Sequence, residues 1–138
     1  MSYSYRYLGA FLSLTELNEK LVSMERTPLS RIIQNPHVTF QYQPKETDTS
    51  LFGEKIEILA IGYANNGTNE GLLVELKTKN LRLFKMSKNI PVPHITLSVS
   101  QTGLAVDTKS LPFQPIKPFS LHAIYGGYTD DEKLITAP

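Results

Sequence analysis

Apolar and polar residues alternate along several short stretches of the chain, a period of two that is typical of β-strands with one buried face. The alternation is clearest at residues 36–42, which read PHVTFQY, and at residues 93–99, which read PHITLSV. In each stretch the histidine and the threonine two residues later share one face, while the aliphatic residues take the other. Both stretches are therefore predicted to be strands that turn an apolar face to the core and a histidine-bearing face away from it.

The remaining pattern predicts further strands and short helices. Aliphatic and aromatic runs predict strands, whereas apolar residues at helical spacing predict helices. The expected strands are 5–12, 55–63, 71–76 and 118–128, and the expected helices are 14–26, 29–35 (a short helical turn) and 78–88. Residues 44–50 and 101–117 are expected to be loops, 65–69 a hairpin turn, and the polar residues from 130 onward a fraying tail.

Capping signals mark where the two longer helices begin. Ser13 and Glu16 have the spacing of a capping box, in which the hydroxyl accepts from a first-turn amide and the carboxylate reaches back to the amide of the serine. Thr78 or Asn80 is expected to cap the second helix. The residues expected to face inward from that helix are Leu81 and Phe84.

The order of these elements is strand, helix, histidine strand and strand, written twice. We therefore expect an α+β fold made of duplicated β-α-β-β units with pseudo-two-fold symmetry, in which antiparallel sheets form a central cleft and the helices lie outside. The chain of 138 residues is expected to be one domain. Its two lobes would be residues 1–64 with 119–128, and residues 65–118.

Composition excludes several classes of site. The chain has no cysteine, which excludes disulfides, thiolate metal sites and cysteine nucleophiles. Its net charge of +1 argues against binding an extended nucleic-acid duplex, which needs a stripe of Lys and Arg. No stretch approaches the roughly 20 apolar residues that cross a bilayer, and no signal peptide is recognisable, so a cytoplasmic protein without membrane association is expected.

The presence of a histidine in both copies of a repeated sequence motif predicts acid–base chemistry. If His37 and His94 face each other across a cleft, one neutral imidazole can accept a proton while the other, protonated, donates one. Thr39 and Thr96 would then offer hydroxyls to the oxygens of a phosphate held between them. Zinc is the competing functional reading, but it would require added carboxylates, and no H-E-x-x-H or similar spacing is present.

The paired phrases PHVTF and PHITL, set in a duplicated β-α-β-β chain, resemble the 2H phosphoesterase superfamily, which is named for its two H-x-T/S motifs. The resemblance covers about residues 5–128. Residues 103–111, GLAVDTKSL, are similar to the loop that follows the second motif in the tRNA-ligase-type branch, although the usual S-N pair is absent. The superfamily includes RNA 2′,3′-cyclic phosphodiesterases, tRNA-splicing phosphodiesterases and phage enzymes that degrade cyclic oligonucleotide signals of bacterial immunity.

The resemblance implies a metal-independent phosphodiesterase that uses no cofactor. His37 and His94 would be general base and general acid in an unassigned order, and Thr39 and Thr96 would bind phosphate oxygens. The implied substrate is a cyclic nucleotide, a cyclic oligonucleotide signal or an RNA end carrying a 2′,3′-cyclic phosphate. The implied setting is RNA processing or evasion of anti-phage defence.

Other residues have weaker claims to the site. Tyrosines on the strands that would flank the cleft offer faces for stacking a base, although packing within the sheet is the favoured interpretation for each of them. These tyrosines are Tyr5, Tyr7, Tyr125 and Tyr128, and the candidate phosphate contacts are Lys109, Arg6 and Lys117. The third histidine, His122, has no accompanying threonine and is expected to be structural or exposed. A non-catalytic protein that sequesters a nucleotide or RNA end, and a protein-interaction domain, remain as alternatives.

Overall fold

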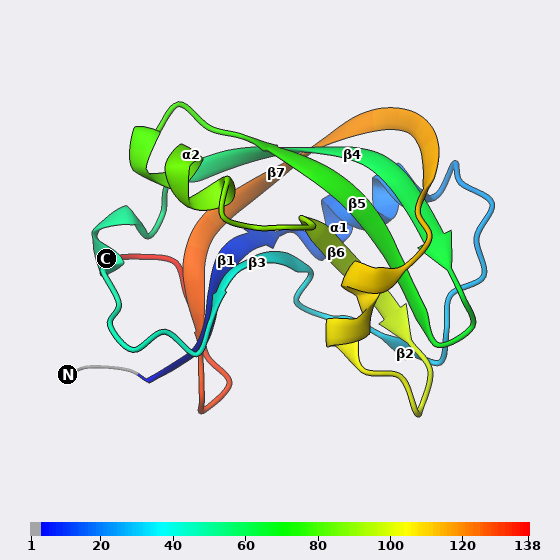
Figure 1. Cartoon of the computed structure of the whole chain (residues 1–138), viewed down its shortest axis with the longest axis horizontal. Helices are drawn as coiled ribbons and strands as arrows, with labels where there is room; N and C mark the ends of the chain where they lie inside the picture. The colour runs from blue at the N-terminus through cyan, green and yellow to red at the C-terminus, as the bar shows by residue number, and fades with distance from the viewer. Residues whose placement is uncertain (1–3) are drawn as a thin grey trace.

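The alternating segments form one antiparallel sheet of eight strands in the computed structural model, which describes residues 4–138 (Figure 1). The strands are β1 (Tyr5–Leu12), β2 (Arg31–Ile32), β3 (His37–Tyr42), β4 (Lys55–Asn65), β5 (Asn69–Lys77), β6 (His94–Val99), β7 (Gln114–Thr129) and β8 (Leu134–Ile135). The helices are α1 (Leu14–Leu21) and α2 (Leu81–Ser87), with 3-10 turns η1 (Thr49–Leu51) and η2 (Ala105–Ser110). The architecture is therefore α+β, as the sequence predicted.

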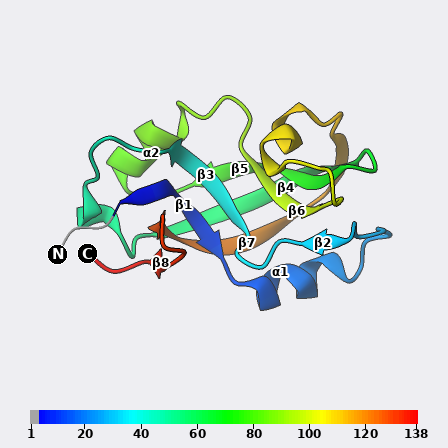
Figure 2. The same ribbon diagram turned by 90° about the horizontal axis from the view of Figure 1, so that it is seen from below.

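The sheet curls until strands near its two edges meet. Its order is β2-β6-β5-β4-β7-β1-β3, with β8 added to β7, so the histidine strands β3 and β6 lie near opposite ends of the hydrogen-bonded series. Residues of β3 and β6 nevertheless contact each other, and the two strands lie close in both views (Figures 1 and 2). The link between β2 and β3 spans the gap, since Ile33 N donates to Leu97 O and Leu12 N donates to Pro36 O, each at 3.0 Å.

The hydrophobic core lies on the face of the sheet opposite the two histidines. Val38, Ile95 and Leu97 point into it from the histidine strands, each at most 4% exposed. Leu17 and Leu83 join the same core from α1 and α2. Burial of each such side chain contributes about 1.5–3 kcal/mol to the free energy of folding. Because side chains alternate between the two faces of a strand, burial of Val38 and Ile95 turns the neighbouring histidines to the opposite face.

Helix α1 keeps half of its expected capping box. Ser13 Oγ accepts from Glu16 N at 3.3 Å, which confirms the cap. The Glu16 carboxylate instead accepts from His122 N at 2.6 Å and contacts His122 Nδ1 at 3.0 Å. The helix ends at Leu21, so its predicted extension to residue 26 is wrong. Beyond the end of the helix, Arg26 forms an ion pair with the distant Glu70.

Three other expectations need correction. Residues 29–35 contain no helical turn, because β2 pairs with β6 there. The tail after 130 does not simply fray, since β8 pairs with β7. In α2, capped by Asn80, the buried residues are Leu83 and Ser87, whereas Leu81 and Phe84 are 64% and 40% exposed. In each case long-range pairing or packing outweighs the local pattern.

None of the helices described in residues 4–138 is long and apolar enough to cross a membrane.

Candidate active site

Each histidine ring makes the same kind of hydrogen bond, from Nδ1 to a nearby backbone carbonyl. His37 Nδ1 lies 2.8 Å from Asn35 O, and His94 Nδ1 lies 2.7 Å from Val92 O, each carbonyl being two residues before the ring. A carbonyl only accepts, so Nδ1 carries the hydrogen in each ring. The neutral imidazole therefore has its lone pair on Nε2 in both cases. The two motifs present the same nitrogen for proton transfer.

Burial lowers the pKa of both imidazoles. Burial lowers the pKa of His37, the hydrogen bond to Asn35 opposes this shift, and the positive charge of His94 lowers the pKa further. Burial is also the main cause of the lowered pKa of His94, with the carbonyl of Val92 acting in the opposite sense. Residues of β3 and β6 contact each other, so the two histidine strands lie side by side at this point of the sheet.

The two H-x-T motifs occupy equivalent places in the sheet. In the β1–β3 register, His37 lies opposite Phe11 and Thr39 lies opposite Gly9. In the β5–β6 register, His94 lies opposite Leu73 and Thr96 lies opposite Gly71. In both pairs the register shifts at the residue just before the glycine. Each threonine therefore stands beside a glycine at a strand irregularity, partly exposed and on the same side as its histidine.

The glycines permit a close approach between backbones. A Cβ at Gly9 would lie 2.4 Å from Val38 O, and one at Gly71 would lie 2.9 Å from Ile95 O and 2.4 Å from Thr108 Cγ2. Val38 and Ile95 are the residues between histidine and threonine in the two motifs. A side chain at either glycine would therefore displace the motif itself.

Among the tyrosines predicted to flank the site, Tyr7 lies against His37. Its ring stacks on His37, with centroids 4.3 Å apart and planes 14° apart. The ring of Tyr128 stacks on the ring of Tyr7, with centroids 5.4 Å apart. The Arg6 guanidinium lies 5.6 Å from the centroid of the Tyr128 ring. Burial is the main cause that raises the pKa of Tyr7 to about 12, so its hydroxyl stays protonated. Sequence reasoning missed Phe11, whose buried ring lies 5.5 Å from His37.

Tyr5 and Tyr125 belong to the core instead. They are 8% and 1% exposed, and both contact Phe52 edge to face at 5.6 and 5.8 Å. Burial raises the pKa of Tyr125 to about 12. With so little exposed surface these two rings pack the sheet, which was the other interpretation open for them.

A hydroxyl network surrounds Thr96 that the sequence did not reveal. Thr96 Oγ1 lies 2.9 Å from Thr108 Oγ1, and Asn69 Nδ2 donates to the same Thr108 oxygen at 3.0 Å. The second donation of Asn69 Nδ2 goes to Leu104 O at 2.7 Å. Asn69 and Thr108 are fully buried. Asn69 lies outside the motifs that the sequence offered, whereas Thr108 lies in residues 103–111, the segment similar to the loop after the second motif, although its contact with Thr96 was not predicted.

Lys109 stands on η2 next to Thr108, and its positive charge lowers the pKa of His94. It therefore lies within electrostatic range of His94, and its role as a phosphate contact stays a prediction. Arg6 donates to Asp130 O at 3.1 Å, and Lys117 has no contact that places it near either histidine. His122 is exposed and bound to Glu16, away from the H-x-T motifs, as predicted for a structural histidine.

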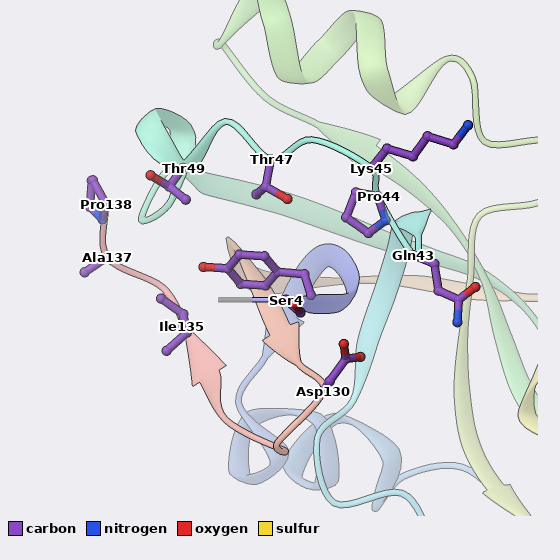
Figure 3. A pocket seen from close by; sticks show the side chains of 11 residues that line it. Ser4, Gln43, Pro44, Lys45, Thr47, Thr49, Asp130, Ile135, Ala137 and Pro138 are labelled. Atoms are coloured by element: carbon purple, nitrogen blue, oxygen red, sulfur yellow. The ribbon is translucent and has the colours of Figure 1, made fainter. Parts of the chain in front are cut away.

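Neither histidine lines the two cavities described next. A cavity of about 950 Å³ lies between the loop after β3 and the chain ends, where Figure 3 shows Lys45, Thr47, Thr49 and Asp130 around it. A second cavity of about 230 Å³ lies between α1 and the β2–β3 link and reaches Thr96 and Pro36. The smaller cavity therefore touches the two histidine motifs through Thr96 and Pro36, and not through the histidines.

Among residues 4–138, no group of three or more His, Asp or Glu side chains is placed to hold a metal ion. In comparisons with known proteins, no family model matches this chain, and no curated protein is significantly similar to it.

Proposed function

We propose that this protein is a metal-independent phosphodiesterase that cleaves a ribonucleotide phosphodiester by general acid–base catalysis with His37 and His94. The observation that carries the proposal is the matched pair of Nδ1-to-carbonyl hydrogen bonds, at 2.8 and 2.7 Å, which leave Nε2 available on both rings. A pair of imidazoles that shares one proton contains both a base and an acid.

The reaction follows from these roles. With a 2′,3′-cyclic phosphate, the neutral histidine takes a proton from water as the water oxygen bonds to phosphorus. The bond from phosphorus to one ribose oxygen breaks, and the protonated histidine gives its proton to that oxygen. With a 3′,5′ linkage, the neighbouring 2′-hydroxyl takes the place of water. Thr39 and Thr96 donate to the non-bridging oxygens, and Lys109 adds positive charge.

Substrate charge supports this protonation state. Burial lowers the pKa of both histidines in the free protein. A bound phosphodiester carries negative charge, which raises the pKa of a nearby imidazole. Binding therefore favours protonation of one ring when the acid is needed.

We also propose that the fold is a duplicated β-α-β-β unit with a pseudo-two-fold axis and with the site between its halves. The series β6-β5-β4-β7-β1-β3 is unchanged in its pairings when β1 and β5, β3 and β6, and β4 and β7 are exchanged. The pairings of threonine with glycine at Gly9 and Gly71 correspond under this exchange. An imidazole from each half then approaches one phosphorus from opposite sides, as in-line displacement requires.

The substrate that fits best is a cyclic nucleotide or cyclic oligonucleotide signal, or an RNA end with a 2′,3′-cyclic phosphate. The stacked rings of Tyr7 and Tyr128 beside His37 offer an aromatic edge to a base. The net charge of +1 favours a compact ligand over a long RNA. Destruction of an immune signal by a phage protein is the setting in which such a small enzyme would act.

Turnover of a substrate panel tests the proposal. Cyclic mononucleotides, cyclic di- and trinucleotides and short RNAs are incubated with chelator, and products are resolved by mass. We expect His37→Ala and His94→Ala each to lower kcat by about 10²–10⁴-fold. His122→Ala is the matched control, because His122 is exposed and bound to Glu16. Turnover that survives both substitutions contradicts the catalytic pair, and recovery of unchanged bound ligand indicates a sequestering protein instead.

A further inference from the structure

Positive charge is concentrated in one stretch of the chain, residues 77–88, which we call the basic segment. It contains five of the 14 Lys and Arg residues and none of the 13 Asp and Glu residues, so the rest of the chain has nine basic and 13 acidic residues. The net charge of +1 therefore conceals a local excess of positive charge in a chain that is otherwise acidic. The five basic residues, all exposed, are Lys77, Lys79, Arg82, Lys85 and Lys88.

Helix α2 attaches the basic segment to the fold through its inner face. Leu83 is fully buried, and Met86 packs against the same core. Asn80 Oδ1 accepts from Leu83 N at 3.1 Å, which fixes the start of the helix. Figure 1 shows α2 at one end of the sheet, and the six residues 88–93 join it to β6 and His94. The positive charges thus stand on a packed helix and not on a loose loop.

The outer face of α2 combines apolar and basic side chains. Positions 81, 84, 85 and 88 are three or four residues apart and therefore lie along one side of the helix. Leu81 and Phe84 are 64% and 40% exposed. The ammonium group of Lys88 lies 4.8 Å from the centroid of the Phe84 ring, and Lys85 is exposed on the same side. An aromatic ring and two ammonium groups are presented together to solvent.

Carboxylates neutralise little of this charge. Arg82 is paired with Asp48, and both side chains are exposed. The ion pairs found within residues 4–138 include none of the four lysines of the basic segment. Glu75 is the nearest acidic residue before the segment in sequence, and Asp107 is the nearest after it. The lysines are therefore available to an anionic partner.

A single RNA strand fits this face better than other polyanions. Single strands offer phosphates to lysines and bases that stack on an aromatic ring, a combination that tolerates any sequence. A duplex keeps its bases stacked on each other and would leave the apolar side chains unused. The seven residues of α2 span about 10 Å, and a helix that lies on a membrane needs a larger apolar face than Leu81 and Phe84 provide.

We propose that the outer face of α2, with the lysines of the basic segment, binds a single-stranded RNA that extends from the bond held at the histidines. The choice of RNA rests on the proposed function, and among the proposed substrates it selects the RNA end. Lys85 and Lys88 contact phosphates, and Phe84 stacks on a base. The connection to β6 keeps the end of α2 within about 25 Å of His94, because an extended chain spans at most about 3.6 Å per residue. A short strand therefore reaches both places.

Binding of a single-stranded 2′-O-methyl RNA of about ten nucleotides to the full chain, followed by fluorescence anisotropy, tests this surface without turnover. The methyl group blocks the 2′-hydroxyl, so this strand cannot attack its own phosphodiester. We expect Lys85→Gln/Lys88→Gln to weaken binding about tenfold at low salt. The slope of log K against log salt should fall by about 1.4, since each phosphate contact with a single strand contributes about 0.7. Phe84→Ala should weaken binding about tenfold with an unchanged slope, because loss of stacking releases no counterions.

Lys20→Gln/Lys133→Gln is the matched control. It removes two exposed lysines outside the basic segment and changes the net charge equally, so it should bind RNA like the wild type. An equal loss in this control, an unchanged salt slope in Lys85→Gln/Lys88→Gln, or no RNA binding by the wild type would each overturn the inference. Binding to phosphatidylserine vesicles that requires Lys85 and Lys88, without binding to RNA, would overturn it in favour of a membrane surface.

Turnover separates this inference from the proposed catalysis. If Lys85→Gln/Lys88→Gln loses RNA binding while His37→Ala and His94→Ala retain turnover, the RNA surface stands and the catalytic pair fails. If the histidine variants lose turnover while Lys85→Gln/Lys88→Gln binds RNA like the wild type, the catalytic pair stands and the RNA surface fails.

Discussion

Tyr7 lies almost parallel to His37, with ring centroids 4.3 Å apart and an angle of 14° between the planes. The stack covers one face of the imidazole, whose Nδ1 is already held by Asn35 O. The ring of His37 is thus restrained in both its plane and its rotation. Burial is the main cause of the lowered pKa of His37. Because the ring of Tyr7 shields His37 from water, Tyr7 contributes to that shift.

Removal of the Tyr7 ring is expected to raise the pKa of His37. In Tyr7→Ala, water reaches the imidazole and stabilises its charged form, so the pKa moves up toward the ordinary value. Tyr7→Phe keeps the stack and should leave the pKa nearly unchanged. Titration of the histidine ring signals by NMR measures both. Tyr42→Ala is the control, because Tyr42 lies opposite Tyr7 in the register but is 66% exposed. An unchanged pKa in Tyr7→Ala would show that the stack does not shield His37.

The pH dependence of turnover should reflect the lowered pKa values. Burial lowers the pKa of His37 and His94 from the ordinary value of 6.5, and the proposed mechanism requires the form of the two rings that holds one proton. We therefore expect kcat/KM, which reports the free protein, to peak below pH 6.5, and kcat to peak at higher pH because bound phosphate raises both pKa values.

Lys109→Ala tests the electrostatic part of this profile. The positive charge of Lys109 lowers the pKa of His94, so its removal should raise that pKa and move the kcat/KM profile to higher pH. The profile of His122→Ala should coincide with that of the wild type. A shift to lower pH in Lys109→Ala would contradict the assignment.

Glu70 is expected to be the most sensitive charged residue for stability. It is fully buried and accepts from Arg26 at 2.8 and 2.6 Å, from Tyr63 at 2.5 Å and from Ser98 at 2.7 Å. Glu70→Ala leaves these donors without a partner, and removing one member of a buried ion pair costs about 3–5 kcal/mol of unfolding free energy.

Urea unfolding measures the loss. Asp48→Ala is the matched control, because the pair of Asp48 with Arg82 is exposed and should contribute little. Equal losses in the two variants would mean that the network around Glu70 is not what holds this region together.

Gly9→Ala should destabilise the first motif. The added Cβ would lie 2.4 Å from Val38 O, a backbone atom that moves only if β3 moves. Overpacking of this kind costs about 1–3 kcal/mol. At Gly62 the nearest contacts would be 3.2 and 3.3 Å, to the side chains of Leu73 and Phe113, so Gly62→Ala should lose less. Thermal unfolding compares the two, and an equal or smaller loss in Gly9→Ala would exclude a close approach at this point.

Local pattern was enough to place the two histidine strands and their faces. Alternation separates His37 and Thr39 from Val38, and burial of the aliphatic residues orients the strand wherever it pairs. The caps at Ser13 and Asn80 were also predictable, because a cap is satisfied by amides two or three residues away.

Tertiary structure separates the tyrosines that the sequence could not rank. Tyr5 and Tyr7 are two residues apart and should share a face, but the register with β7 shifts between them. Tyr5 therefore packs against Phe52 in the core, while Tyr7 stacks on His37. A bulge is a property of the strand pair, and neither strand encodes it alone.

From its own residues, this sequence determined an α+β fold, two strands with matching H-x-T faces, and the helix starts, because each depends on neighbours within a few positions. The sequence did not determine which residues form hydrogen bonds with Thr96, which residue the Glu16 carboxylate accepts from, or how the sheet curls so that β3 contacts β6. Those contacts join residues from 12 to 106 positions apart. They form only when the whole sheet closes around one core, and no local pattern specifies that closure.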